Sequence, residues 1–112
     1  MDIQPKFQVV YTQDVRDFLK ELDLKVRTKI LYNVQKASYS LDPKLFKKLE
    51  GQEIWEFRTV YAGMQYRMLA FWDHSSQTIV VATHGFIKKT QKTPQKEIDR
   101  ANNIRTQYFN HK

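Results

Sequence analysis

Three consecutive strand-like runs constrain the fold of this chain more than any other feature of its sequence. They are rich in β-branched and aromatic residues, and two short turn-like segments, Ala62-Gly63 and residues 73–77, connect them. Connections this short join neighbouring strands that run in opposite directions, so the runs predict an antiparallel meander. The three runs are Glu53–Tyr61, Met64–Asp73 and Thr78–Phe86.

Before the meander, the sequence predicts one strand and then helix. Residues 7–11 alternate and are rich in β-forming side chains, which predicts a first strand. Thr12 is the predicted N-cap of a helix whose apolar residues recur every three or four positions. After a polar joint near Asp23 the helical spacing resumes, so the segment is either one kinked helix or a helical hairpin. The apolar stripes are Val15, Phe18, Leu19 and Leu22, then Val26, Ile30, Val34 and Ala37.

The remaining segments flank the meander directly. Asp42-Pro43 excludes helix at residue 42, and a short turn is predicted over Pro43–Leu49, with Gly51 as its end. After the meander, Thr93 is the predicted N-cap of a last helix and Pro94 its first residue. The predicted order is β-αα-βββ-α. This order favours an α+β fold, in which a small antiparallel-rich sheet is flanked by an N-terminal helical pair and a C-terminal helix.

Length and composition exclude several classes of protein. At 112 residues, the chain has room for one domain, predicted to span residues 1–112. It contains no cysteine, which excludes disulfides, thiolate metal sites and a thiol nucleophile. Its three histidines lack the spacing of a metal site, so no metal or cofactor is predicted. No signal peptide or bilayer-spanning apolar run is found, and a cytoplasmic protein is expected.

The positive charge is concentrated at one end of the chain. The formal net charge is +7, yet residues 1–84 carry 12 basic and 10 acidic side chains while residues 85–112 carry seven basic and two acidic ones. Such a basic stripe is typical of a protein that binds a phosphate-rich partner. The alternatives are a solvated tail that maintains solubility and, less well supported, a membrane surface, because the basic helix lacks a broad apolar face.

Two arginines in the meander are candidates for binding phosphate. Alternation along a strand places Glu56 and Arg58 on one face. Arg67 lies within a strongly apolar run, where a guanidinium is costly to desolvate without a partner. Arg67 either pairs with Glu56 or extends to the rim of the sheet, or it is aimed at a phosphate, which suits its planar fork.

The segment from Thr83 to Pro94 adds lysines next to these arginines. It contains three lysines and three threonines and leads into a helix N-terminus, where free N–H groups favour anions. It is not a P-loop, and taken alone it is typical of a solvated loop. His84 is a candidate proton donor, although a lone histidine at a strand end is more often structural.

Several segments together resemble the phage-derived Gp49-like branch of HigB toxins, within the RelE/ParE superfamily of type II toxin–antitoxin systems. The resemblance covers about residues 7–109, and Phe86–Pro94 is its most specific part. The segments are Leu45–Gly51, Ile54–Arg58, Tyr66–Leu69 and His84–Pro94, with Glu97-Ile98 and Ala101 behind them.

The resemblance implies an mRNA interferase, that is, an endoribonuclease that cleaves mRNA on the ribosome and so inhibits translation. The implied partners are the ribosome, mRNA and a HigA-like helix-turn-helix antitoxin, with no membrane. Two alternatives stay open: a ParE-like poison of DNA gyrase, and a non-catalytic basic module that binds nucleic acid.

The resemblance also implies a set of site residues. Arg67 matches the superfamily's arginine at the scissile phosphate, and basic residues on the neighbouring strands complete the catalytic set of Arg58, Arg67, Lys88 and Lys89. Glu56 and His84 are the candidate acid or base, and Lys88 or Lys89 would serve as base only with a lowered pKa. The residues expected to bind RNA are Lys47, Lys48 and Lys92.

Overall fold

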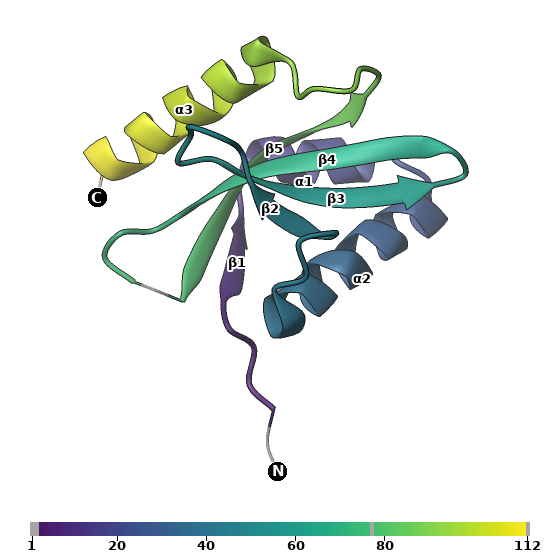
Figure 1. Cartoon of the computed structure of the whole chain (residues 1–112), viewed down its shortest axis with the longest axis horizontal. Coiled ribbons are helices and arrows are strands. Elements are labelled where there is room, and N and C mark those ends of the chain that lie inside the picture. The colour runs from purple at the N-terminus through teal and green to yellow at the C-terminus, as the bar shows by residue number, and fades with distance from the viewer. Residues whose placement is uncertain (1–2, 77, 112) are drawn as a thin grey trace.

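The computed structural model describes residues 3–76 and 78–111, and within them it confirms an α+β fold. Helices and strands follow one another as expected from the sequence, with one additional strand (Figure 1). The elements are β1 (Gln8–Tyr11), α1 (Gln13–Lys20), α2 (Leu24–Ser40), β2 (Phe46–Lys48), β3 (Trp55–Tyr61), β4 (Met64–Trp72), β5 (Ile79–Lys88) and α3 (Gln95–Asn110).

The described strands form a single sheet in the order β1-β5-β4-β3-β2. β1 runs parallel to β5, and the other pairs are antiparallel, which confirms the predicted meander of β3, β4 and β5. Its first turn is tight because Ala62 and Gly63 both have positive φ, 50° and 78°, the geometry of a two-residue hairpin loop.

The two faces of the sheet are covered differently. α1 and α2 pack on one face over a large apolar cluster that includes Val15, Ile30 and Met68. α3 lies on the other face, as Figure 1 shows, over a smaller cluster around Leu69, Phe71 and Ala101. Because α3 contacts only β4 and β5 closely, the rest of this second face is not covered by helix.

The segment after α2 confirms the predicted turn only over residues 43–45, because residues 46–48 form the strand β2. Phe46 and Lys47 of β2 pair with Phe57 and Glu56 of β3, and the Phe46 ring lies 4.4 Å from the Phe57 ring. The turn prediction was wrong for residues 46–48 because a three-residue edge strand carries almost no periodicity of its own. Pairing with β3 and burial of Phe46 decide its conformation.

The helix boundaries confirm one predicted cap and correct another. Thr12 caps α1, because its Oγ1 accepts a hydrogen bond from the Val15 amide at 3.2 Å. The helical pair is a hairpin of two separate helices. α3 begins at Gln95, so Pro94 occupies the cap position predicted for Thr93. The Thr93 hydroxyl donates instead to the Glu56 carboxylate on β3.

Candidate functional site

Arg58 and Arg67 lie directly opposite each other on β3 and β4, on the face that carries α3. Two like charges in such a cross-strand pair repel each other unless an anion lies between them. Glu56, two residues before Arg58 on the same face, supplies that anion. Its Oε1 is 3.0 Å from Arg58 Nε and 3.4 Å from Arg67 Nε.

The Glu56 side chain is fully buried and both of its oxygens are in contact with other groups. Oε1 faces the two arginines, and Oε2 accepts a hydrogen bond of 2.5 Å from Thr93 Oγ1. A carboxylate held in this way neutralises the arginine pair and ties β3 to the start of α3. It is not open to a substrate hydroxyl, so the geometry favours a structural role for Glu56 over that of a base.

Arg67 is the most buried of the candidate cations, with 6% of its surface exposed. Its Nη2 donates to Gln65 Oε1 at 2.6 Å and its Nη1 donates to the Tyr66 carbonyl at 3.1 Å. Its Nε makes no hydrogen bond, although it lies near Glu56. Burial lowers the pKa of Arg67, and Glu56 opposes that effect. Because a guanidinium keeps its proton in proteins, the result is a fixed positive charge beneath the surface.

Lys88 joins this cluster from β5 because of a bulge in the sheet. Leu69 pairs with His84 whereas Ala70 pairs with Ala82, so Thr83 is an extra residue in β5. One extra residue moves every later side chain to the opposite face. Without it, Lys88 would share the face of Ala82, which belongs to the core under α1 and α2.

The pKa of Lys88 is lowered by its surroundings. Burial has the largest effect; Glu56 raises the pKa, and Arg67 and Arg58 lower it again. Lys88 is therefore coupled electrostatically to the arginine pair. An amine of this kind is neutral more often at a given pH than an exposed lysine is.

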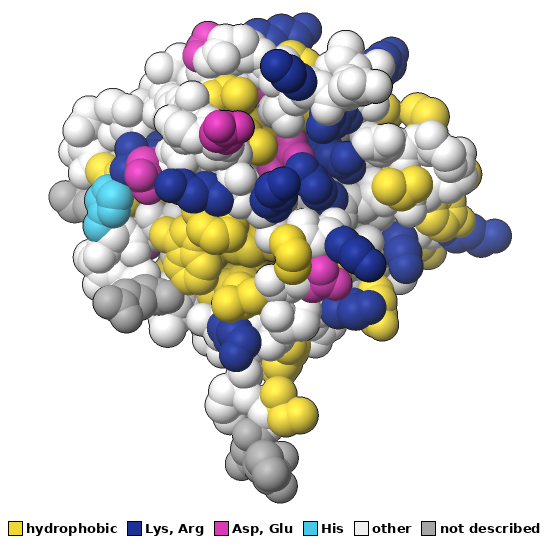
Figure 2. Space-filling model, viewed as in Figure 1, with side chains coloured by type: hydrophobic (Ala, Val, Ile, Leu, Met, Phe, Trp, Pro, Cys, Tyr) yellow, Lys and Arg dark blue, Asp and Glu magenta, His cyan; other side chains and the backbone are white. Residues whose placement is uncertain are grey.

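Arg58 and Lys88 line a groove of about 600 Å³ between the sheet and the start of α3. Arg67 is buried opposite Arg58 and is not part of this lining. Figure 2 shows Lys and Arg side chains gathered across the middle of this face. The groove has the volume of a small-ligand site, and its charge suits a phosphate. Its cationic lining residues are Lys47, Lys48, Arg58, Lys88 and Lys92.

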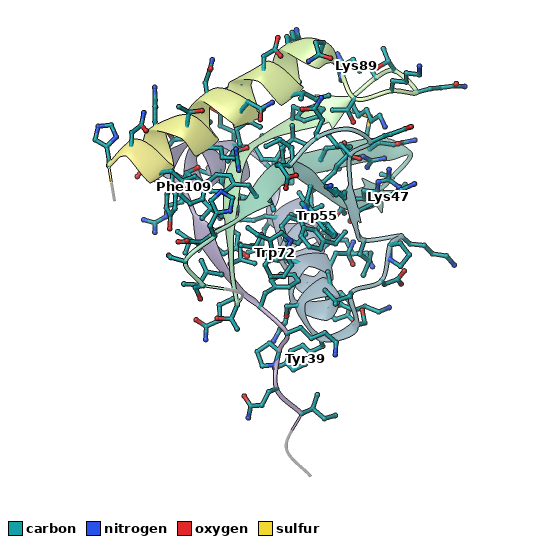
Figure 3. All side chains as sticks on the ribbon, turned by 60° about the vertical axis from the view of Figure 1, so that its left-hand side comes forward. Tyr39, Lys47, Trp55, Trp72, Lys89 and Phe109 are labelled. Atoms are coloured by element: carbon teal, nitrogen blue, oxygen red, sulfur yellow. The ribbon has the colours of Figure 1, made fainter. Side chains whose placement is uncertain are left out.

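Lys89 lies apart from the groove. It lines a neighbouring hollow between the β3–β4 hairpin and the loop after β5, together with Met64 and Gln65. In Figure 3, Lys89 is on the loop that leads into α3, away from Lys47. The structure thus brings Lys88 to the arginines but not Lys89.

His84 is also outside the groove. It is buried beneath α3, where Nδ1 lies 3.1 Å from Thr83 Oγ1 and Nε2 lies 3.2 Å from Glu97 Oε1. Burial lowers its pKa, Arg100 lowers it further, and Glu97 opposes both. This position suits a residue that fixes α3 on the sheet better than one that donates a proton to a substrate.

A family model described as phage-derived protein Gp49-like matches residues 17–106. The chain belongs to this Gp49-like family. No curated protein matches the chain in sequence.

Among solved structures, this Gp49-like protein is similar to a mutant of the E. coli toxin RelE in the free state, in which two arginines are replaced by alanine. The TM-score is 0.63, the sequence identity is 13%, and the match covers 89% of this chain and 97% of that chain. The similarity confirms a RelE-like fold. The expected Gp49-like branch is confirmed as well, and the narrower assignment to HigB stays a prediction.

Two residues that hold the cluster of Glu56 and the arginines, one through Arg67 and one through Glu56, were not predicted as site residues from the sequence. Gln65 holds Arg67, and alternation along β4 was a signal that could have found it, because it lies two residues before Arg67. Thr93 was noted only as a helix cap. Its bond to Glu56 joins positions 37 residues apart and has no local signal.

Two further observations concern the described part of the Gp49-like chain. Within residues 3–76 and 78–111, no three side chains of the metal-binding types gather closely enough to hold an ion. The helices found there are too short or too polar to span a bilayer.

Proposed function

We propose that this Gp49-like protein is the toxin of a type II toxin–antitoxin system and cleaves mRNA on the ribosome at the basic groove. The observation that carries the proposal is the pair of arginines held side by side by one buried carboxylate, of which Arg58 lines a groove that four lysines also line. Membership of the Gp49-like family and the fold shared with the E. coli toxin RelE support it.

The groove supplies what RNA cleavage without a metal requires. A base removes the proton of a ribose 2′-hydroxyl, and the resulting oxygen forms a bond to the adjacent phosphorus. The bond from phosphorus to the 5′-oxygen then breaks, leaving a 2′,3′-cyclic phosphate and a 5′-hydroxyl. Arg58 and Arg67 stabilise the negative charge that builds up on the phosphate, an effect that fixed cations can make worth 10²–10³-fold in rate or about 3–4 kcal/mol.

Lys88 is the proposed base. It lines the groove, and its pKa is lowered by burial and by the two arginines. A positioned base contributes roughly 10²–10⁴-fold. Neither Glu56 nor His84 lines the groove, so the acid that protonates the leaving oxygen comes from the solvent or from the ribosome. This incomplete acid–base set is the reason for proposing that the ribosome aligns the mRNA.

Lys47, Lys48 and Lys92 are proposed to bind RNA phosphates on either side of the reacting one, because they lie along the groove and are exposed. The proposed inhibitor is a HigA-like helix-turn-helix antitoxin. An acidic or amphipathic segment of that protein would cover the same cations, and the cytoplasm is the compartment in which all these partners meet.

The test is expression of the protein from a tightly repressed promoter, with growth measured and mRNA 5′ ends mapped. The proposal expects growth arrest with new 5′ ends inside translated reading frames, and neither effect from the Arg67→Ala variant at equal expression. Arrest without new mRNA ends would overturn the nuclease. Accumulated gyrase–DNA cleavage complexes would then indicate a ParE-like poison, and their absence a basic binding module.

A further inference from the structure

A second hollow, of about 610 Å³, adjoins the basic groove. It lies between the β3–β4 hairpin and the loop after β5, and Lys88 and Gln91 line both spaces. A chain bound in the groove can therefore continue past Lys88 into the second hollow without crossing another element. The lining of the second hollow includes Met64, Gln65, Ile87, Lys88, Lys89 and Gln91.

The charge of the second hollow suits a site that binds RNA but takes no part in its cleavage. Lys88 and Lys89 are consecutive at the end of β5, so their side chains leave the strand on opposite sides. Lys88 faces the arginines, whereas Lys89 is exposed and contributes its charge to the second hollow. Arg58 lines the basic groove but not this hollow, so the Lys89 ammonium group is placed to bind a phosphate that does not react.

The remaining lining is typical of a site for a flat, partly apolar group. Met64 is 41% exposed at the hairpin, and Ile87 is half-buried beside it. The hairpin turn holds Met64 in place, because Ala62 and Gly63 are fixed in the left-handed region. Flexible methionine side chains adapt well to the face of a ring.

Gln65 supplies the polar contact. Its Oε1 accepts a hydrogen bond from Arg67, so the amide group that remains for a ligand is its NH₂, which is a donor. Gln65 is exposed and lines the hollow. Gln65 alternates with Met64 along β4 and pairs with Lys88, so its NH₂ lies at the border between the groove and the second hollow. There it can donate to the oxygen or nitrogen acceptors on the edge of a nucleobase.

We propose that the second hollow is a subsite for the nucleotide next to the scissile phosphate. Lys89 binds the phosphate of that nucleotide, Met64 packs against its base, and Gln65 donates to the edge of the base. The inference rests on the proposed function for the identity of the strand in the groove. It assigns Lys89 to binding and assigns Met64 and Gln65 to sequence preference. It also separates Lys89 from the chemical step carried by Arg67 and Lys88.

The test is single-turnover cleavage of mRNA on programmed ribosomes, measured over a range of protein concentrations. Lys89→Met and Met64→Ala should each raise the half-saturating concentration about five- to tenfold, the size of one phosphate or base contact, while the plateau rate changes less than about twofold. Met64→Ala should also narrow the differences in cleavage between codons. Matched controls are Lys36→Met and Val60→Ala, exposed residues outside both hollows that should change neither value.

Two results would overturn the subsite. One is an unchanged half-saturating concentration in both variants. The other is a plateau rate that falls in Lys89→Met as far as it falls in Arg67→Met, because Lys89 would then act in the chemical step.

Binding of an uncleavable 2′-O-methyl RNA hexamer separates failure of the inference from failure of the nuclease proposal. Lys89→Met should weaken binding and lower the slope of log affinity against log salt by about one. This result would support the subsite even if the wild-type protein cleaves nothing. Unchanged affinity and slope would contradict it even if the wild-type protein is a nuclease.

Discussion

The two faces of the sheet are built from the same strands but are used in opposite ways. Under α1 and α2, the face is apolar and closely packed, with rings such as Phe46 and Phe57 stacked on one another and Trp55 and Trp72 side by side (Figure 3). On the other face, only part is apolar and covered by α3. The rest holds Glu56, Arg58 and Arg67 next to an open groove.

This difference indicates that the apolar face contributes most of the stability of the fold, whereas the charged face contributes less. Buried ion pairs stabilise a fold weakly compared with apolar residues of similar volume, because each charge must be desolvated. The arginine pair is therefore poorly explained as a device for stability. It fits the proposed function, in which the positive charge that remains after pairing with Glu56 attracts a substrate phosphate.

The largest expected effect is the loss of the carboxylate between the arginines. Glu56→Gln should lower the free energy of unfolding by about 3–5 kcal/mol, because the buried Arg67 and the half-buried Arg58 lose their counter-charge. Denaturant unfolding checks it, and the exposed Glu53→Gln should change stability by less than about 0.5 kcal/mol. If Glu56→Gln does not fold, the double variant Glu56→Leu with Arg67→Met should restore folding. Continued failure to fold would show that Glu56 contributes to folding by more than the balance of charge.

The apolar face gives the contrasting result. Ile30→Ala, at a residue 2% exposed, should lower the free energy of unfolding by about 2–5 kcal/mol through the cavity that it leaves. Its cleavage rate per folded molecule should stay at the wild-type value, because Ile30 faces away from the groove. A loss of cleavage rate in folded Ile30→Ala would contradict the assignment of stability to one face and of cleavage to the other.

The next effect concerns the pH dependence of cleavage. A base must be neutral to accept a proton, so the rate should rise with pH and level off above the pKa of Lys88, which lies below that of an ordinary lysine. Lys88→Arg, which stays charged, should lower the rate about 100-fold or more and abolish this rise. A pH profile that is the same in the variant would remove Lys88 from the role of base.

The smallest effect concerns the link between β3 and the start of α3. Thr93→Val keeps the shape but loses the hydroxyl, so it should destabilise the fold by about 1 kcal/mol and lower the cleavage rate several-fold. Thr93→Ser keeps the hydroxyl and should restore both values. Equal behaviour of the two variants would mean that the bond to Glu56 does not position the groove.

The sequence predicted those parts of the fold that depend on local pattern. Alternation along β3 placed Glu56 and Arg58 on one face, and the Ala62-Gly63 turn predicted the hairpin that brings Arg67 beside them. β2 escaped prediction because three residues are too few to show alternation and its pairing partner follows later in the chain.

The sequence predicted most residues of the candidate site, but it did not predict how they are arranged. Sequence alone could not choose between Lys88 and Lys89, because the extra residue Thr83 in β5 decides which of them faces the arginines, and a bulge has no reliable local signal. The burial of His84 under α3 and of Glu56 beneath Thr93 likewise depends on how α3 packs. Contacts between segments this far apart in the chain cannot be predicted from the residue spacing within α3 or within the strands.

The most direct measurement is the chemistry of the RNA ends made by purified protein on programmed ribosomes, with Arg67→Met beside the wild-type protein and Arg16→Met, an exposed arginine on α1, as the matched control. The account predicts a 2′,3′-cyclic phosphate and a 5′-hydroxyl from the wild-type protein and from Arg16→Met. From Arg67→Met it predicts a rate lower by about 10²–10³-fold. Cleavage at the wild-type rate by folded Arg67→Met, or ends that carry a 5′-phosphate, would contradict it.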